Sequence, residues 1–532
     1  MLWWVNLGES AFFITFASMF IRKRKNPSGS ISVSVVTKRH GKYREVKIFG
    51  TATSDEAVSR LYADAEHWLK TRGNQLPIDF DDERGREREE TIRVVDNMDA
   101  VLINGTQLLL GQMYDKVGFN RIPDEILRHL VIARVSQPRS KLATVAYLKS
   151  YYDEDVDLNR IYRYMDKLYD TQKELVQQIS VEHTRCLLGG NIGLMFYDVS
   201  TLYFETSKTD VLREPGFSKD GKTKESQVVL GLLVSRDGYP LSYSLYNGSQ
   251  YEGYTMIPMI DDFRQRFNLG ENFVVVADSG LMNADNLKLL REAKYKYVIG
   301  ARIKNEKMGV KEKILSWEKE NDSYYEYRQE NGDRLIVGYS EARAKKDAYN
   351  RNRGVERLRK AYSSGTLPKD QVNKRGYNKF LEISKDVQVV ISDEKIAEDE
   401  KWDGLKGYVT NTNLSADEVV SQYHGLWVVE RAFRVSKGTL EMRPVFHFTE
   451  RRIEAHVCIC FVAYKVYKEL ERVIASLGIK LSVDKVLDIA KTVTTVRVNM
   501  PQNHDVYTRT LFLSELQKVI KPLFDLPNIG AD

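Results

Sequence analysis

Two aspartates in this sequence each end an apolar run of the kind that forms a buried strand. Asp198 closes the run NIGLMFYD, and Asp278 closes the run FVVVAD. An ionised carboxylate is seldom buried without a partner or a metal, so core packing explains neither residue well. If the two strands are neighbours, their ends bring the acids close together, where they repel each other unless cations lie between them. The alternative is that each acid separately faces solvent or caps a turn.

A third acid, Glu430, lies in a segment whose spacing puts aromatic, acidic and basic side chains on one helical face. At 100° per residue, five residues fall within an arc of roughly 80°. They are Tyr423, Trp427, Glu430, Arg434 and Lys437. Such a face suits a metal-binding acid flanked by phosphate-binding cations. The alternative is an ordinary ion pair between Glu430 and Arg434, which are four residues apart.

Several other acids near these segments compete for a chemical role. They are Glu205, Asp210, Asp220, Glu225, Glu252, Asp285 and Asp403. Asp285 is more simply explained as a favourable charge at the start of a helix, and Asp220 as part of a turn. Glu252 and Asp403 are harder to dismiss and stay open as candidates.

Composition and missing motifs narrow the function classes. The chain has 532 residues, 80 Lys+Arg, 74 Asp+Glu, a net charge of +6 and 3 cysteines. Its length predicts about three to four domains, and the few cysteines favour a reducing, cytoplasmic setting. His456, Cys458 and Cys460 have metal-like spacing, but their apolar surroundings favour a buried helix. Neither HExxH nor G-x4-GK-[ST] occurs, which argues against a zinc hydrolase and against ATP-driven chemistry.

The elements that must position the acids alternate in the order β-β-β-α-β-α-β over residues 191–302. The predicted strands are 191–198, Gln227 to Ser235, Leu241 to Tyr246, Phe273 to Ala277 and Tyr297 to Ala301, and the helices are 255–268 and Ala284 to Lys294. This order is typical of an RNase H-like mixed-sheet core in the α/β class. Residues 303–400 break the rhythm, and we expect a largely β insertion there that also carries a basic helix. Residues 401–475 return to the core with helices at 417–438 and 450–475.

The N-terminal part contains a basic module at 19–85. Alternation around a glycine turn predicts a β-hairpin at 28–50, followed by a helix. The many Lys and Arg residues fit either a DNA-backbone contact or a solvated small sheet. Residues 1–18 are expected to be an upstream extension, with translation starting at either Met1 or Met19.

Helical patterns fill residues 98–190, and a helical tail is expected at 476–532. Short helices with brief joins can form a DNA-binding helix-turn-helix in the first of these regions. The scattered tyrosines there fit a helical core better than DNA readout. The charge-dense stretch 79–92 before it is expected to be a linker.

Together these motifs resemble the DDE-class transposases of bacterial insertion sequences, in the group with the signature Y-x2-R-x3-E-x6-K. The residues that match, with the spacing intact, are Tyr423, Glu430 and Lys437. The Arg position of the signature holds Leu426, and Arg431 or Arg434 can take over its phosphate contact. The stretches YDVSTLYFE (197–205), GFSKDGK (216–222), QVVLGLLVSRDGYPL (227–241) and ADSGLMN (277–283) are also similar to this family.

The resemblance implies a metal-dependent catalytic centre on the RNase H-like core. In it, Asp198, Asp278 and Glu430 bind two Mg²⁺ ions, for which Mn²⁺ can substitute; such ions prefer oxygen ligands and promote phosphodiester cleavage without a covalent protein intermediate. The DNA contacts expected beside it are those of Tyr423, Trp427, Arg431, Arg434 and Lys437.

The activity that the resemblance implies is cut-and-paste DNA transposition, in which cleavage at the element ends is followed by strand transfer. The implied partners are double-stranded DNA with terminal inverted repeats, target DNA and a second copy of the chain in a synaptic complex. The expected location is the cytoplasm, with the nucleoid and without a membrane. Two alternatives stay open: an RNase H-like nuclease without strand transfer, and a catalytically dead DNA-binding regulator, against which the three intact acids count.

Overall fold

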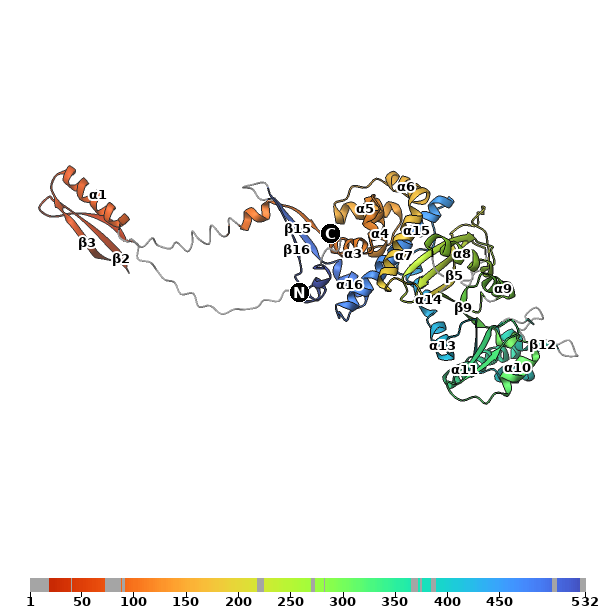
Figure 1. The fold of residues 1–532 in the computed structure, drawn as a ribbon. Helices are drawn as coiled ribbons and strands as arrows, with labels where there is room; N and C mark the ends of the chain where they lie inside the picture. The colour runs from red at the N-terminus through yellow and green to blue at the C-terminus, as the bar shows by residue number, and fades with distance from the viewer. Residues whose placement is uncertain are drawn as a thin grey trace. The chain divides into compact units, whose positions relative to one another are not determined.

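The computed structural model describes residues 19–39, 41–71, 88, 91–217, 224–268, 273–281, 283–364, 372–373, 376–383, 389–499 and 505–526. Two compact units contain them, one ending at Asn97 and one beginning at Met98 (Figure 1). The predicted extension at 1–18, nearly all of the predicted linker at 79–92, and Asp220 lie outside the described residues.

The first unit is an antiparallel sheet covered by one helix. Its elements are β1 (Met19–Lys25), β2 (Ile31–Arg39), β3 (Lys42–Ala52) and α1 (Asp55–Thr71), with the strand order β1-β2-β3. The pairing of β2 with β3 confirms the predicted hairpin. Val33 and Val35 pack with Val58 and Ala65 of α1 in a small core. The basic run MFIRKRK forms the extra strand β1 against β2, which the alternation in the sequence did not predict.

The second unit is built on an eight-stranded mixed sheet with the order β10-β11-β14-β9-β8-β5-β6-β7. The strands are β5 (Leu194–Tyr203), β6 (Gln227–Ser235), β7 (Pro240–Asn247), β8 (Val274–Ala277), β9 (Lys296–Ala301), β10 (Tyr324–Arg328), β11 (Arg334–Tyr339) and β14 (Leu405–Thr410). β5, β8 and β9 are parallel, and the other neighbours are antiparallel. The order β5-β6-β7-α8-β8-α9-β9 along the chain confirms the arrangement predicted for 191–302.

Helices cover both faces of this sheet. On one face lie α8 (Met256–Phe267), α9 (Ala284–Glu292) and α10 (Met308–Ser316), and on the other α13 (Ala416–His424), α14 (Trp427–Lys437) and α15 (Glu450–Ser476). In β5, Met195 and Tyr197 pack in the core on the side of α8, α9 and α10, whereas Phe196 packs in the core on the side of α13, α14 and α15. Because strand side chains alternate with a period of two, Asp198 and Ser200 point to the face of α13, α14 and α15.

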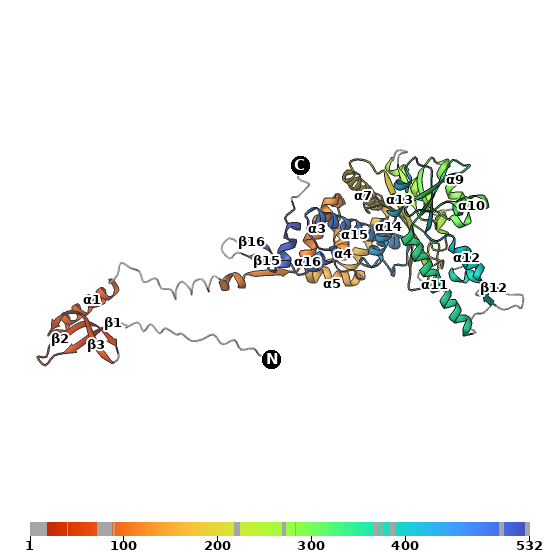
Figure 2. The ribbon, with the colours of Figure 1, turned by 90° about the horizontal axis from the view of Figure 1, so that it is seen from below.

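The helix α15 packs against α3 (Gly105–Val117), α4 (Glu125–Ser136), α6 (Leu158–Lys167), α7 (Lys173–Leu187) and α16 (Val483–Ala490) in a group of helices (Figures 1 and 2). Two further helices extend this group: α5 (Lys141–Tyr152) contacts α4 and α6, and α17 (Glu515–Ile520) contacts α16. The prediction that the scattered tyrosines belong to a core is confirmed in part. Tyr164 is buried in this group, Tyr147, Tyr162 and Tyr169 are half-buried, and Tyr151 is exposed. α15 is buried continuously from Ala455 to Tyr467, but no helix in the described part of the chain is both long and apolar enough to cross a membrane.

The segment 303–400 was predicted to be largely β, and this was wrong. It contains α10, the 23-residue α11 (Glu341–Ser363) and α12 (Asp393–Glu400). Its strands β10 and β11 extend the main sheet, and only β12 (Leu381–Ile383) and β13 (Val389–Ile391) form a separate pair. The helical content is high because the charged run of α11 consists mostly of good helix formers.

The prediction of a helical tail at 476–532 was also wrong in part. Beyond α16 the chain forms β15 (Thr494–Asn499) and β16 (Val506–Leu511), which pair with β4 (Met98–Leu102) in the order β16-β15-β4. The runs TTVRVN and VYTRTL are rich in β-branched residues, which favour strands. Their partner β4 lies nearly four hundred residues earlier, so local pattern alone does not reveal the pairing.

Candidate active site

Asp198 and Asp278 lie next to each other in the sheet. β5 and β8 pair in parallel up to Tyr197 opposite Ala277, and each aspartate is the next residue of its chain. Neighbouring strands are about 4.8 Å apart. Val276, two residues before Asp278, belongs to the same core as Phe196, so both acids point to the face that α13 and α14 cover.

Tyr423 of α13 binds one of these acids directly. Its hydroxyl donates a hydrogen bond to Asp278 Oδ1 at 2.7 Å. Burial alone would raise the pKa of Asp278, but the bonds from Tyr423 and from the following backbone, together with the Lys406 cation, hold it below the usual value of 3.8. Tyr423 itself is only 8% exposed. The prediction was that Tyr423 contacts DNA, but in this position it holds Asp278 in its ionised form.

The single helix predicted for 417–438 is two helices, which corrects the helical-face argument. At the junction, Val428 N donates to Gly425 O at 3.0 Å, three residues back instead of four. Gly425 packs so closely on the Phe196 ring that an added Cβ would lie 2.3 Å from Phe196 Cζ. Tyr423 therefore belongs to α13, whereas the other four residues of the predicted face stay together on α14.

Glu430 lies on α14, which runs alongside β5. α14 begins next to Phe196, and near its other end the Lys437 ammonium donates to the Ser200 hydroxyl. Asp198 lies between Phe196 and Ser200 on the same face of β5. Because seven residues make almost two turns, Glu430 and Lys437 share one side of α14. Glu430 is exposed on this side of α14, and its approach to Asp198 stays a prediction.

The donor set fits Mg²⁺, but its predicted geometry is not formed. Asp198, Asp278 and Glu430 offer carboxylate oxygens, the hard ligands that Mg²⁺ prefers. Within the described ranges, no three Asp, Glu, His or Cys side chains are close enough together to hold a metal ion. Within the chain, the hydrogen bond from Tyr423 and the Lys406 cation both stabilise the ionised form of Asp278. The three-acid metal site stays a prediction.

The side chains predicted to contact DNA have different surroundings. Trp427 is 58% exposed, and Arg434 is also exposed. Lys437 is half-buried over the Phe433 ring, 5.7 Å from its centroid. Arg431 forms an ion pair with Glu471 of α15, so its guanidinium joins two helices. Contact of Trp427, Arg434 and Lys437 with DNA stays a prediction.

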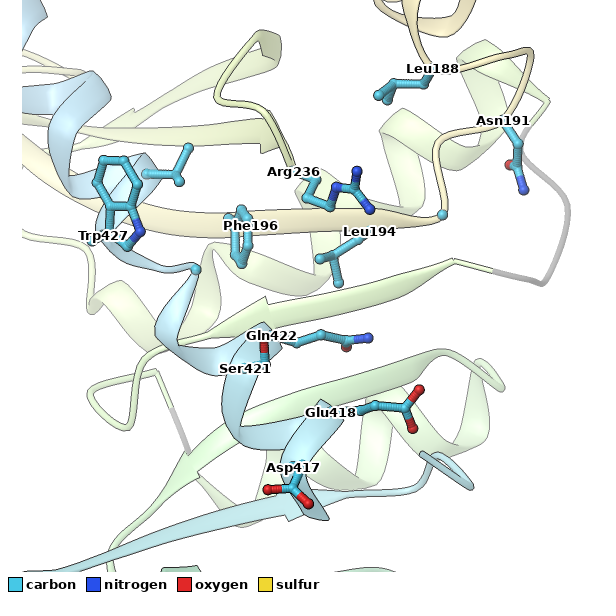
Figure 3. Close-up of a pocket in the computed structure, with 13 residues that line it drawn as sticks. Leu188, Asn191, Leu194, Phe196, Arg236, Asp417, Glu418, Ser421, Gln422 and Trp427 are labelled. Atoms are coloured by element: carbon cyan, nitrogen blue, oxygen red, sulfur yellow. The ribbon is translucent and has the colours of Figure 1, made fainter. Parts of the chain in front are cut away.

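A cavity of about 760 Å³ adjoins the junction of α13 and α14. Its walls are the beginning of β5, α13 and the first turn of α14, as Figure 3 shows. Phe196 lies in it between Trp427 and Gln422, and Arg236 from the turn between β6 and β7 reaches over the strand. The exposed indole of Trp427 therefore borders a hollow large enough for a nucleotide-sized group.

Two basic residues near Asp278 were not identified as candidates from the sequence. Lys406 lies in β14, with its ammonium 5.1 Å from the centre of the Tyr423 ring, and it contributes to the low pKa of Asp278. Arg302 follows β9 and donates to Ser279 O at 3.0 Å, which holds the loop after Asp278. Lys406 is the one charged residue in the run LKGYVTN at 405–411, and this signal could have marked it as a candidate.

Two of the six competing acids that the structure describes form ion pairs within the fold, and a third lies at a helix start. Asp210 bonds Arg213 at 2.7 Å, and Asp403 bonds Arg351 at 2.6 Å. Asp285 lies in the first turn of α9, as predicted. The other three described acids, Glu205, Glu225 and Glu252, stay open as candidates.

The histidine and cysteine cluster is part of α15 and confirms the buried-helix interpretation. His456 Nε2 lies 2.9 Å from the carbonyl oxygen of Met442, and Cys460 Sγ lies 3.9 Å from the same nitrogen. Burial lowers the pKa of His456 well below its usual value and raises that of the Cys458 thiol to about 12. A neutral thiol is a poor metal ligand.

The comparisons with known proteins concern this part of the chain. A family model described as "Transposase DDE domain" matches residues 193–465, from β5 to α15 and including all three acids. A piggyBac transposase synaptic complex with hairpin DNA is 11% identical, with 73% of this chain and 76% of that chain covered and a TM-score of 0.37. Two further matches are a Mos1 transposase paired-end complex with the left transposon end and a Mos1 mariner paired-end complex with Mn. Each is 9% identical to this chain, and each match covers 33% of this chain and 58% of the other. Their TM-scores are 0.15 and 0.14. No curated protein matches.

Proposed function

Because the chain belongs to the family described as the transposase DDE domain and is therefore an enzyme of DNA transposition, we propose that it excises a bacterial insertion sequence and joins it to target DNA. The observation that carries the proposal is the common register of Asp198 and Asp278 beneath the helix that bears Glu430. Acids side by side on adjacent parallel strands serve metal-dependent phosphodiester chemistry well, because a divalent cation relieves their repulsion.

The subgroup we propose is the one with the Y-x2-R-x3-E-x6-K signature. Tyr423, Glu430 and Lys437 support it by their spacing. Leu426, at the Arg position, is buried, so it makes no phosphate contact. Arg434 is exposed on α14 and is our candidate for that contact.

Asp198, Asp278 and Glu430 are the residues that would hold two Mg²⁺ ions, with Mn²⁺ as a substitute. When bound, such ions activate the attacking oxygen and stabilise the leaving one. The chain prepares Asp278 for this role, because its lowered pKa keeps the carboxylate ionised at neutral pH. Tyr423 fixes the orientation of that carboxylate through its hydrogen bond.

The cations of α14 would bind the substrate backbone. Ser200 holds the Lys437 ammonium beside β5, two residues beyond Asp198, where a phosphate at the acids would meet it. Arg434 extends the same basic face. Trp427 would stack on an unpaired base, since exposed aromatic rings bind bases of any sequence. Arg431, paired with Glu471, would stabilise the helix packing instead of contacting DNA.

The partners in this proposal are DNA with terminal inverted repeats, target DNA and a second copy of the chain. The first unit supplies further cations for the DNA backbone. Arg22 and Lys38 lie over the Tyr43 ring, 4.2 and 5.3 Å from its centroid. Such a basic surface adds sequence-independent affinity that falls as salt rises.

The test is cleavage of DNA that carries the inverted repeats flanking the coding region, with and without Mg²⁺. We expect Asp198→Asn, Asp278→Asn and Glu430→Gln each to abolish cleavage while DNA binding is retained. Glu292→Gln is a matched control, because Glu292 is an exposed acid of α9 on the opposite face of the sheet. Loss of folding in all three variants would mark the acids as a structural network.

Two further outcomes separate the alternatives. Cleavage without joining to a target plasmid would favour an RNase H-like nuclease. DNA binding without cleavage in Mg²⁺ or Mn²⁺ would favour a regulator that has lost its activity. Three intact acids in the matched domain count against the second alternative.

A further inference from the structure

A second cavity lies between the helical group and the loop that follows α14. Its volume is about 200 Å³, and its walls come from the end of α4, the start of α5, residues 441–447 and α15. The basic residues that line it are Arg134, Arg139, Lys141, Arg443, His447 and His456. Glu441 is the one acid among the lining residues, and it is exposed.

Lys141 is the central feature of this cavity. Its side chain lines the cavity although the residue is only 5% exposed. The charged side chain that acts on it most strongly is the Arg134 guanidinium, which has the same sign, and the exposed Glu441 carries the only carboxylate among the described lining residues. Burial, with this repulsion, lowers the pKa of Lys141 to about 7. A buried ammonium without a counter-ion is costly, and an anion in the cavity would remove that cost.

The groups that face Lys141 from the neighbouring elements supply no negative charge. Burial lowers the pKa of His447 to about 3 and that of His456 well below its usual value, so both rings are neutral. Burial also raises the pKa of the Cys460 thiol, which keeps it protonated. The neutral His456 ring donates through Nε2 to the Met442 carbonyl oxygen, so its buried Nδ1 is an acceptor without a partner. The Arg134 guanidinium donates to Arg139 O at 3.3 Å. The groups that can attract an anion into the cavity are therefore the Lys141 and Arg134 cations.

The backbone of α5 adds to this positive field. Ser140 caps the helix, and its hydroxyl oxygen accepts from Ala143 N at 3.2 Å. Ser140, Lys141 and Leu142 all line the cavity, so the first turn of the 12-residue helix α5 opens into it. Helix N-termini carry unpaired N–H groups and a partial positive charge, and they bind phosphate well.

The cavity is connected to the candidate active site by the loop after α14. Val445 N donates to Tyr203 O at 3.1 Å, and the Arg443 guanidinium lies 5.5 Å from the centre of the Tyr203 ring. Tyr203 is five residues beyond Asp198 on β5, about 17 Å along the strand. Successive phosphates of one DNA strand advance about 3.4 Å along the helix axis, so on a DNA strand that ran along β5 the loop would lie about five nucleotides from the acids.

We propose that this cavity binds a backbone phosphate of the DNA strand that occupies the active site. The ligand chemistry is a phosphate oxyanion bound by Lys141, Arg134 and the first turn of α5. The inference rests on the proposed function for the source of the phosphate, since free inorganic phosphate has the same chemistry. It adds to that function a contact that fixes the strand at a distance from the reacting bond.

The first arm of the test uses inorganic phosphate and the full-length chain. Thermal unfolding is followed in phosphate and in chloride at equal ionic strength, for the wild type, Lys141→Met and the control Lys149→Met. Lys149 is on the same helix, is exposed, and pairs with Asp155 at 3.7 Å. We expect phosphate to raise the melting temperature of the wild type and the control but not that of Lys141→Met. Equal protection of all three proteins would overturn the site.

The second arm measures binding of a short duplex over a range of salt, without divalent metal. We expect Lys141→Met to bind about tenfold more weakly, as for one lost hydrogen bond to a charged group, with a salt slope reduced by about one. The control should match the wild type. Phosphate protection that Lys141→Met loses, together with an unchanged salt slope, would assign the cavity to free phosphate and overturn the DNA assignment. If the wild type binds no DNA, the proposed function fails, and the phosphate arm alone decides whether the cavity is an anion site.

Discussion

Replacing Tyr423 by phenylalanine removes one hydroxyl and keeps the buried ring, so it isolates a single hydrogen bond of the proposed catalytic site. The hydroxyl donates to Asp278 Oδ1 at 2.7 Å. Burial alone would raise the pKa of Asp278, and the bond from Tyr423 is the largest of the effects that lower it. The variant should therefore leave Asp278 less firmly oriented and less acidic, without opening a cavity.

The magnitude follows from the charge of the acceptor. A hydrogen bond to a charged group contributes about 1.5–3 kcal/mol, and about 1.4 kcal/mol corresponds to a factor of ten in an equilibrium constant. Groups that orient a metal ligand typically change metal affinity or activity by about 10- to 100-fold. We expect the Mg²⁺ concentration for half-maximal cleavage to rise at least about tenfold in Tyr423→Phe, with DNA affinity unchanged.

The assay is cleavage of inverted-repeat DNA over a Mg²⁺ titration, with DNA binding measured separately. Tyr408→Phe is the matched control, because the Tyr408 ring packs against Tyr423 with the ring centres 4.9 Å apart. An unchanged Mg²⁺ dependence in Tyr423→Phe, or an equal shift in both variants, would refute the assigned role of the hydroxyl.

The same variant has a pH signature with a definite sign. Because the pKa of Asp278 is lowered in the folded chain, the bonds to its carboxylate stabilise the fold above the unfolded pKa, and this stabilisation is lost as the pH falls through the folded value. The difference in unfolding free energy between wild type and Tyr423→Phe should therefore shrink below pH 3.8. A difference that stays constant on acidification would show that the hydroxyl does not stabilise the ionised carboxylate.

Three further predictions concern α14 and the second cavity. Lys437→Ala should weaken the DNA complex and lower its salt slope by about one; an unchanged slope would contradict a phosphate contact. Gly425→Ala should cost about 1–3 kcal/mol of stability and reduce cleavage, since the new Cβ meets Phe196, and Phe196→Leu in the same chain should restore part of both. The stability of the wild type relative to Lys141→Met should rise by about 1.4 kcal/mol per pH unit from pH 7 to about 10, because the unfolded lysine still binds its proton there while the buried one does not. Stability curves that run parallel through this range would exclude a neutral Lys141.

Much of the central sheet could be predicted from the sequence, because its information is local. Apolar runs of strand length, each followed by an acid, predicted β8 to within one residue. The same pattern located β5, but β5 continues to Tyr203, so Asp198 lies within its strand and not at the end of it. Parallel pairing then puts the residues after the two runs side by side, so Asp198 and Asp278 were found together. Glu430 could be assigned to a helix by spacing, although its helix begins later than expected.

The features that could not be predicted depend on distant contacts. The junction between α13 and α14 lies where Gly425 meets Phe196, a residue more than two hundred positions earlier. The pairing of β15 with β4 spans an even longer separation. Lys141 reads in the sequence as an ordinary surface lysine at a helix start, and only the folded chain buries it against α15. Burial of a charge is a tertiary property that a local pattern does not contain.

Because α13 and α14 are separate helices, they can position different parts of the proposed site. α14 carries Glu430 and Lys437, and α13 carries the tyrosine that binds Asp278. α14 is held at its start by the close packing of Gly425 on Phe196 and near its end by the bond from Lys437 to Ser200. Both anchors lie on β5, on either side of Asp198. Any movement of α14 along β5 therefore shifts Glu430 and Lys437 together relative to Asp198, whereas Asp278 is oriented independently through α13. Metal binding and phosphate positioning should accordingly fail together in variants that loosen α14, but separately in variants of Tyr423.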